Sequence, residues 1–315
     1  MEENERPPKV VALLSRKGGV GKSTIALNLA VLLSERASVV MLDMDPQGSL
    51  SRWADRRKKN RKLTPSEREN PLVTQMTQRP ENLRRVLAKV EEYDVEYCVI
   101  DTPSNVVAAA QAAVRAADCV LIPVRASYFD LSAIRETAEY VESAGKPLFG
   151  VLNGLKVGSS AGAEAEEALR ELGIPTLDAR LSDRLVYSRS VTSGLSVTEA
   201  ANRELGGETR QEADAAALEV RAMRAELFRR MPALAAAGAP PERASEKAEE
   251  AGERPQAPAP PEAGNGGAAD MKEVSFSLPR QMWKDMRWAC IEKEQSIQEW
   301  MKEAVRAQLE AEARG

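Results

Sequence analysis

Residues 17–24 combine two lysines, three glycines and two hydroxyl side chains in one short segment, Lys17-Gly18-Gly19-Val20-Gly21-Lys22-Ser23-Thr24. The segment follows an apolar run at Val10–Leu14 and opens a helical pattern over Ser23–Ser34. Glycines let successive backbone N–H groups converge on phosphate oxygens, and the start of a helix adds its positive dipole end. In such a loop the second lysine reaches the β- and γ-phosphates, and the hydroxyl after it coordinates Mg²⁺. The order of strand, loop and helix predicts a phosphate-binding P-loop.

Three aspartates stand at the ends of apolar runs. Asp43 ends the run Val39–Asp43, Asp45 follows two residues later, and Asp101 ends the run Cys98–Asp101. Because the carboxyl ends of parallel strands face the ligand crevice of an open sheet, we expect these carboxylates beside the P-loop. The alternative is that one of the first pair only caps a helix that begins near Gly48.

The composition excludes several kinds of chemistry. The chain has 315 residues, a net charge of -4 and no histidine, so Ser-His-Asp and Cys-His catalysis and histidine-ligated zinc or haem are excluded. Proton transfer falls to carboxylates, lysines or water. Cys98, Cys119 and Cys290 form no Cys-x-x-Cys pair, which argues against a disulfide framework, a zinc site or an iron–sulfur reductase. The mild acidity means that a polyanion must bind at a local patch.

Short apolar runs alternate with amphipathic stretches over residues 9–230, which predicts an α/β domain with a parallel sheet flanked by helices on both faces. The predicted strands are Val10–Leu14, Val39–Asp43, Cys98–Asp101, Cys119–Pro123 and Leu148–Leu152. The predicted helices are Ser23–Ser34, Glu81–Glu91, Val106–Ala116, Leu131–Ser143, Ala163–Leu172 and Glu208–Arg230. Residues 1–8 are expected to be a disordered N-terminus without a signal-peptide pattern. No run is apolar for long enough to cross a membrane, so we expect a cytoplasmic protein.

Two further parts are predicted after residue 230. Residues 231–270 hold seven prolines, three basic and seven acidic residues and no aromatic residue. Such a segment buries too little surface to fold, which predicts a flexible linker. Residues 271–315 begin with an alternating strand pattern at 273–279 and continue with two helical stretches. About 45 residues are too few for an independent core, so we expect this part to pair with a second copy.

Several motifs resemble the ParA/MinD-type ATPases of the deviant Walker A group, and together they span residues 9–230. The mark of that group is a second lysine at the start of the P-loop, which here is Lys17. The resemblance continues at Asp43–Ser49, Val99–Pro103, Val120–Leu131 and Arg184–Glu199, although the family commonly has proline where this chain has Ala126. The resemblance implies an ATP-dependent switch with slow hydrolysis and with ATP and Mg²⁺ as cofactors.

The resemblance also implies roles for single residues. Lys17 would reach the partner's phosphates across an ATP-bridged homodimer, and Gly18 would be small because the opposing subunit packs against it. Lys22 would be catalytic as well, and Asp45 would position the attacking water. Nucleotide contacts are expected from Gly18, Gly19, Val20, Gly21, Lys22, Ser23, Thr24, Pro123 and Asn153, the last two for adenine. Metal contacts are expected from Ser23, Asp43 and Asp101, with Asp43 also helping to hold the loop lysine. For Asn153 the alternative is a simple turn former.

ParA proteins bind DNA non-specifically as ATP dimers, and two basic groups of this chain are candidates for that contact. Arg210, Arg221 and Arg224 fall on a narrow stripe of the predicted final helix. Arg180, Arg184, Arg189 and Arg203 precede that helix and are candidates to join the stripe. The second group is the denser run from Arg56 to Lys62. For the stripe the alternative is an ordinary solvated face, because acidic residues are nearly as numerous over residues 180–230. For the run from Arg56 to Lys62 the alternatives are a solvated helix end and a contact with a partner.

Residues 272–311 resemble a ribbon-helix-helix domain, in which strands of two chains pair and present outward residues to the major groove. The outward residues would be Glu273, Ser275 and Ser277, of which Ser275 and Ser277 are the candidates for the DNA contact. The alternative is a dimerisation module without DNA contact. Together the resemblances imply a nucleoid-associated ATPase that partitions or positions a plasmid or chromosome with a ParB-like or adaptor partner. Two alternatives stay open, a positioning ATPase for a protein cargo and a nucleotide-regulated transcriptional repressor.

Overall fold

A computed structural model describes residues 7–64, 67–68, 70–75, 82–93, 95–104, 106–125, 131–156, 160–203 and 208–231. All of them belong to the first of the two units into which the chain divides, Met1–Gly238 and Ala239–Gly315. The module expected at 271–315, with Ser275 and Ser277, and the linker expected at 231–270, apart from its first residue, lie outside the described residues. Their boundaries therefore stay predictions.

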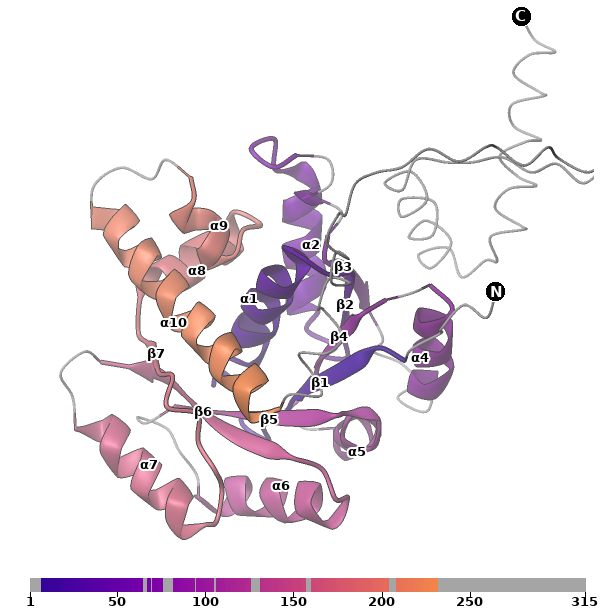
Figure 1. Ribbon diagram of the computed structural model, residues 1–315, viewed down its shortest axis with the longest axis vertical. Helices are drawn as coiled ribbons and strands as arrows, with labels where there is room; N and C mark the ends of the chain where they lie inside the picture. The colour runs from indigo at the N-terminus through magenta and orange to yellow at the C-terminus, as the bar shows by residue number, and fades with distance from the viewer. Residues whose placement is uncertain are drawn as a thin grey trace, which may run out of the picture. The chain divides into compact units, whose positions relative to one another are not determined.

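Seven strands form one sheet in which every neighbouring pair runs parallel. The spatial order is β3-β2-β4-β1-β5-β6-β7. The strands are β1 Lys9–Leu13, β2 Val39–Asp43, β3 Leu72–Gln75, β4 Tyr97–Asp101, β5 Cys119–Arg125, β6 Leu148–Leu155 and β7 Leu181–Ser182. Because β1 lies in the middle, between β4 and β5, the P-loop that follows it leaves the centre of the sheet (Figure 1). This topology confirms the predicted α/β class.

Helices cover both faces of the sheet (Figure 1). They are α1 Lys22–Ser34, α2 Ser49–Lys59, α4 Leu83–Glu91, α5 Val107–Ala116, α6 Leu131–Ser143, α7 Ala161–Glu171, α8 Leu185–Thr192, α9 Val197–Ala201 and α10 Glu208–Arg230. The helices α1 and α10 lie on one face, with α8 and α9 beside α10, and α5 and α6 lie on the other. Within the described ranges, no helix is both long and apolar enough to span a bilayer.

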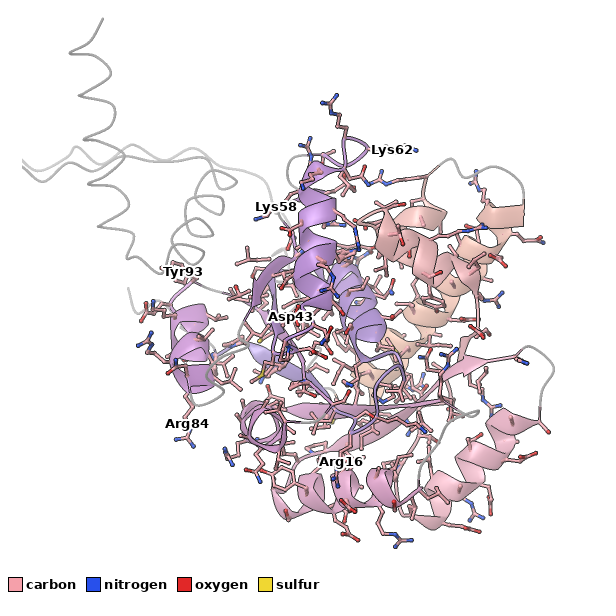
Figure 2. The ribbon with its side chains drawn as sticks, turned by 180° about the vertical axis from the view of Figure 1, so that it is seen from behind. Arg16, Asp43, Lys58, Lys62, Arg84 and Tyr93 are labelled. Carbon is pink, nitrogen blue, oxygen red and sulfur yellow. The ribbon has the colours of Figure 1, made fainter. Side chains whose placement is uncertain are left out.

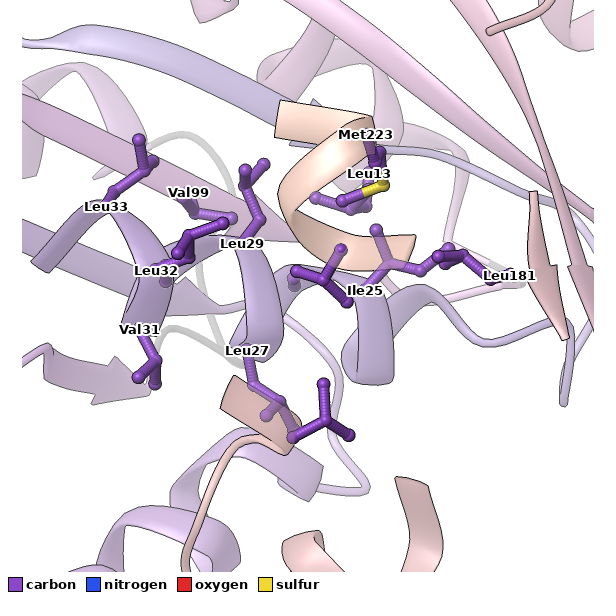
Figure 3. Close-up of a cluster of buried hydrophobic side chains, with 14 of the residues drawn as sticks. Leu13, Ile25, Leu27, Leu29, Val31, Leu32, Leu33, Val99, Leu181 and Met223 are labelled. Atoms are coloured by element: carbon purple, nitrogen blue, oxygen red, sulfur yellow. The ribbon is translucent and has the colours of Figure 1, made fainter. Parts of the chain in front are cut away.

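The main core lies between the sheet and the helices α1 and α10 (Figure 3). Side chains alternate across a strand, so Val11 and Leu13 of β1 belong to this cluster, together with Leu29 of α1 and Met223 of α10. The even-numbered residue Val10 is buried as well, because helices also cover the opposite face. Each fully buried leucine contributes about 1.5–3 kcal/mol relative to an exposed one. Burial on both faces explains why the strands read as uninterrupted apolar runs.

The predicted elements agree with the structure to within a few residues at their ends, whereas the short elements at the sheet margins were not predicted. The edge strands β3 and β7 have four and two residues, too few to give a periodic signal. The helices α8 and α9 occupy the segment 184–199, which the motif comparison covered without assigning an element. Edge strands are commonly short because a long open edge invites pairing with another chain.

Candidate nucleotide-binding site

The P-loop, residues 17–24, connects the end of β1 to the start of α1 and takes its shape from left-handed glycines. Gly19 has a φ of 74° and Gly21 has a φ of 99°, which side chains with a Cβ rarely adopt. Gly21 is also the N-cap of α1, so the backbone N–H groups that follow it lack helical partners and face the loop. An anion bound there meets both these groups and the positive end of the helix dipole.

Asn153, near the carboxyl end of β6, supports the P-loop by a hydrogen bond to the loop backbone. Its Nδ2 donates a hydrogen bond of 2.7 Å to the carbonyl oxygen of Val20. A Cβ at Gly21 would lie 2.1 Å from the same Nδ2, so this amide also requires glycine at the N-cap. The adenine contact expected of Asn153 stays a prediction, and the structure gives this residue a different task, which is to hold the loop backbone. Pro123 is buried on β5 and lines a small recess together with Lys17 and Val20.

Lys22 lies within the site and is only 6% exposed. Its Nζ donates to Ser104 Oγ at 2.7 Å and to the carbonyl oxygen of Lys17 at 3.4 Å. Burial lowers the pKa of the Lys22 ammonium below its ordinary value, while the carboxylates of Asp101 and Asp45 act in the opposite direction. The ammonium group is therefore held by two neutral oxygens at the position where a P-loop lysine meets phosphate.

Asp43 and Asp101 face each other in register on the neighbouring strands β2 and β4, but they have different partners. The Oδ2 of Asp43 accepts from the backbone N and the hydroxyl of Ser51, at 2.9 and 3.0 Å, and its Oδ1 accepts from the N of Asp45 at 3.2 Å. Burial raises the pKa of Asp43, and the hydrogen bonds from Ser51 oppose that shift. Asp43 thus caps the first turn of α2, which fits the alternative foreseen for this pair of aspartates. Its contact with a metal stays a prediction.

Asp101 has the properties of a ligand for a hard cation. Its side chain is 0% exposed, and neither carboxylate oxygen has a hydrogen-bond partner among the described residues. Burial raises the pKa of Asp101 to about 7, the charges of Asp43 and Asp45 add to the shift, and Ser23 and Lys22 oppose it. A buried carboxylate without partners is costly unless a cation neutralises it. Asp101 and Ser23, a carboxylate and a hydroxyl beside the P-loop, therefore fit Mg²⁺, which takes oxygen ligands and would keep Asp101 ionised.

Asp45 lines an open cleft of about 660 Å³ that the P-loop also borders. The cleft is lined by Gly18, Gly19, Gly21, Lys22, Ser23, Thr24, Leu27, Asp45, Pro46, Gln47, Ser49, Pro103, Ser104, Val106 and Val191. The Oδ1 of Asp45 accepts a hydrogen bond from the backbone N of Gln47 at 2.9 Å. The geometry thus brings together the P-loop residues, Asp45 and Asp101, as expected.

The arginines of the α10 stripe contact other side chains of the protein, which their spacing alone does not predict. Arg210 is 60% exposed and lies 4.0 Å from Asp214, and Arg221 is 42% exposed and lies 3.6 Å from Glu35. Arg224 is half-buried and packs over the ring of Phe228. Three of the four preceding arginines form ion pairs with carboxylates: Arg180 with Glu166, Arg184 with Glu219 and Arg203 with Glu67. Much of this positive charge is therefore neutralised on the protein itself.

The basic run at the end of α2 divides into one buried residue and several exposed ones. Arg56, Lys58, Lys59, Arg61 and Lys62 are exposed, and Figure 2 shows Lys58 and Lys62 near the far end of the helix. Arg57 is buried, so neither a solvated helix end nor a contact with DNA describes this residue. Its guanidinium binds the carboxylate of Glu199 and three backbone carbonyls, and sequence periodicity alone gave no signal for that partnership.

The fold and the site define a P-loop nucleotide-binding domain, and comparison with known proteins gives its family. The family described as the CobQ/CobB/MinD/ParA nucleotide binding domain matches residues 11–197. The maintenance of carboxysome distribution protein A of Gloeobacter kilaueensis is 34% identical over 195 residues, which cover 60% of this chain and 84% of that protein. Its namesake from Halothiobacillus neapolitanus is 32% identical over 211 residues, 65% of this chain and 91% of that protein.

Solved structures agree with this fold. The septum site-determining protein MinD of Pyrococcus horikoshii, in complex with Mg-ADP, has a TM-score of 0.51 at 17% identity and covers 71% of this chain and 98% of its own. An ATP complex of Cyanothece McdA has a TM-score of 0.50 at 21% identity, with 69% and 97% covered. The chain belongs to the CobQ/CobB/MinD/ParA family of nucleotide-binding domains. It is an ATPase of the ParA/MinD type, and ATP and Mg²⁺ are the cofactors of this family, as the sequence predicted.

Proposed function

We propose that this ATPase is a DNA-associated positioning switch, which dimerises on Mg-ATP, binds DNA without sequence preference and is released by slow, partner-stimulated hydrolysis. In this proposal Lys22, Ser23 and Asp101 hold the phosphates and Mg²⁺, and Asp45 orients the attacking water. Lys17 reaches the phosphates of the partner subunit. The chain has no histidine, so water activation rests on a carboxylate.

The observation that carries the proposed dimer is the environment of Gly18. Gly18 is exposed, its backbone lies outside the left-handed region, and a Cβ built there would meet only Ser104 Oγ, at 4.0 Å. Within the described residues nothing in the subunit therefore requires glycine at this position, unlike Gly19 and Gly21. A second subunit that packs closely against the P-loop would leave no room for a side chain at position 18 and would explain the glycine.

Light scattering during size-exclusion chromatography tests this dimer. We expect wild-type protein to be dimeric in Mg-ATP and monomeric in Mg-ADP. A Cβ at Gly18 would meet no described atom closer than 4.0 Å, so Gly18→Val should leave the loop backbone intact, still bind ADP and remain monomeric in Mg-ATP. Lys17→Gln serves as a second variant that retains the glycine. A Gly18→Val protein that dimerises normally in Mg-ATP would refute the face-to-face arrangement.

The exposed end of α2 is a better candidate for the DNA contact than the stripe on α10. We call the residues Arg56, Lys58, Lys59, Arg61 and Lys62 the α2 basic patch. Four of its members, all but Lys58, form no ion pair with any described residue, in contrast to Arg210 and Arg221. Basic residues in the last turn of a helix also stabilise the negative end of its dipole. Arg61 and Lys62 lie beyond the last turn of α2, so this stabilisation does not account for them.

The composition of the surface favours duplex DNA over single strands. Proteins that bind single strands stack bases on exposed aromatic rings. The large hydrophobic side chains exposed in the described ranges are valines and leucines, and none is aromatic. A cluster of lysines and arginines without rings suits the evenly spaced phosphates of a duplex backbone.

Fluorescence anisotropy with a random-sequence duplex, in Mg-ATP and over a range of salt concentrations, compares the two surfaces. We expect Lys59→Gln plus Lys62→Gln to weaken binding and to reduce the salt slope by about two, since each phosphate contact contributes about 0.9. The matched control is Arg210→Gln plus Arg221→Gln, which removes the same charge from α10. If only the control pair weakens binding, the α10 stripe is the DNA contact.

The cargo is either a DNA molecule or a protein assembly. The two relatives above are named for carboxysome distribution, which favours a protein assembly. The chromosome partitioning protein ParA of Myxococcus xanthus is 29% identical over 167 residues, which favours DNA. Footprinting of the full chain on its genomic neighbourhood separates the alternatives. Protected repeats support partition through residues 271–315, protection of its own promoter alone supports a repressor, and no protection supports a protein cargo.

A further inference from the structure

The ammonium group of Lys22 is anchored by a residue outside the P-loop. Lysine carries three N–H donors, and two of them are used here, one to Ser104 Oγ at 2.7 Å and one to the Lys17 carbonyl at 3.4 Å. Within the described residues no carboxylate lies close enough to Lys22 to form an ion pair, although Asp101 and Asp45 are nearby. Two anchored donors fix the direction of the third.

Ser104 is itself held in place by the segment that carries it. This segment follows β4, and the hydroxyl of the buried residue Thr102 donates to the carbonyl oxygen of Leu13 at 2.7 Å. Leu13 is the last residue of β1, so the bond ties the Ser104 segment to the strand from which the P-loop starts. Pro103 stands between the two hydroxyl residues and restricts the backbone at that point. The anchor of Lys22 therefore lies in a short segment after β4 that is hydrogen-bonded to the end of β1.

We propose that Ser104 is a positioning residue, which aims the third N–H of Lys22 into the nucleotide cleft. Ser104 lines that cleft together with Lys22, Gly18 and Gly19, so the aimed N–H points to where the β- and γ-phosphates of a P-loop ligand lie. A lysine side chain loses considerable rotamer freedom when it is fixed, and an anchor made before binding removes that cost from the binding step. This inference rests on nucleotide binding at the P-loop and is independent of the proposed dimerisation and DNA contact.

The test measures ADP binding to the full chain by isothermal titration calorimetry in the presence of Mg²⁺. We expect Ser104→Ala to weaken ADP binding about tenfold, the effect of one hydrogen bond to a charged group. Ser104→Thr retains the hydroxyl and should restore the affinity to within about twofold. Ser143→Ala, which removes an exposed hydroxyl bonded to Tyr140 at the end of α6, is the control and should leave the affinity unchanged.

A thermal unfolding midpoint, measured without nucleotide, separates positioning from a purely structural role. Positioning predicts that Ser104→Ala leaves this midpoint close to that of Ser143→Ala while the ADP affinity falls. A large loss of stability together with the loss of affinity would assign Ser104 a structural role and overturn the proposal. Unchanged or tighter ADP binding in a stable Ser104→Ala protein would overturn it as well, because the anchor would then not assist the phosphate contact. Weak ADP binding by wild-type protein would instead reject the nucleotide site itself.

Discussion

The buried pair of Arg57 and Glu199 gives the sharpest stability prediction. Arg57 Nη2 lies 2.6 Å from Oε1 of Glu199, and the two side chains are 2% and 13% exposed. A second donor, on Nη1, binds Oε2 of Glu199 at 2.8 Å, and the other three bind the carbonyl oxygens of Glu67, Asn70 and Gly194, so all five donors are used. Glu199 also closes the capping box of α9 with Ser196. One glutamate therefore joins α2 to the turn between α8 and α9.

Glu199→Ala removes the charge partner and the cap together. Removing one member of a buried ion pair costs about 3–5 kcal/mol, because the other charge stays buried without compensation. Loss of the capping interaction adds about 0.5–2 kcal/mol. Since domains are stable by only about 5–15 kcal/mol, the variant should lose a large part of its stability. At a urea m-value of about 2–3 kcal/mol/M, the two losses together should lower the midpoint by about 1–3.5 M.

Urea unfolding followed by circular dichroism measures this shift. The matched control is Glu167→Ala, which breaks a pair of the same chemistry with Arg170 on the exposed face of α7. Solvent screens that pair, so the control should hardly move the midpoint. Combining Arg57→Ala with Glu199→Ala should cost less than the sum of the two single changes, because both remove the same ion pair. A Glu199→Ala midpoint equal to that of the control would refute the reasoning.

Three further predictions concern the nucleotide site. Asp45→Ala should bind ATP normally and lose turnover in a phosphate-release assay, and lost ATP binding would contradict the role of Asp45 in orienting water. Burial raises the pKa of Asp101 to about 7, well above the value in the unfolded chain, so native protein holds an extra proton between about pH 4 and 7. Its contribution to stability, measured by urea unfolding without nucleotide or Mg²⁺, should therefore decline as the pH rises from 5 to 8, and Asp101→Asn should flatten that decline. Asn153→Ala should weaken binding of both ADP and inorganic pyrophosphate, because Val20 loses its support. Calorimetry in which only ADP binding weakens would assign Asn153 to adenine instead.

The phosphate chemistry could be predicted from sequence because it depends on local order. The strand, the glycines, Lys22 and Ser23 are consecutive, and the backbone of a P-loop needs little from the rest of the chain. Asp43, Asp45 and Asp101 could also be placed, since the ends of parallel strands meet at one edge. The long periodic helices and central strands followed from the same alternation of apolar runs.

Contacts between distant segments could not be predicted in this way. Arg57 looks like its basic neighbours in the sequence, and only the fold brings Glu199 to it across 142 positions. Likewise, spacing on α10 identified a stripe of arginines but not the carboxylates beside them, which belong to Glu35 at the C-cap of α1 and to Asp214 of α10 itself. Asn153 and Ser104 belong to the same class, because each reaches the P-loop from another strand end. Side-chain partnerships of this kind are set by topology and not by local pattern.

The most direct test of the central claim is sedimentation velocity of Asp45→Ala protein in Mg-ATP, in Mg-ADP and without nucleotide. Slow turnover makes the ATP state of this variant long-lived, so hydrolysis does not obscure the comparison. The account predicts a dimer in Mg-ATP and a monomer in the other two conditions. A monomer under all three conditions, with ATP bound, would contradict the claim that ATP joins two subunits across the P-loop.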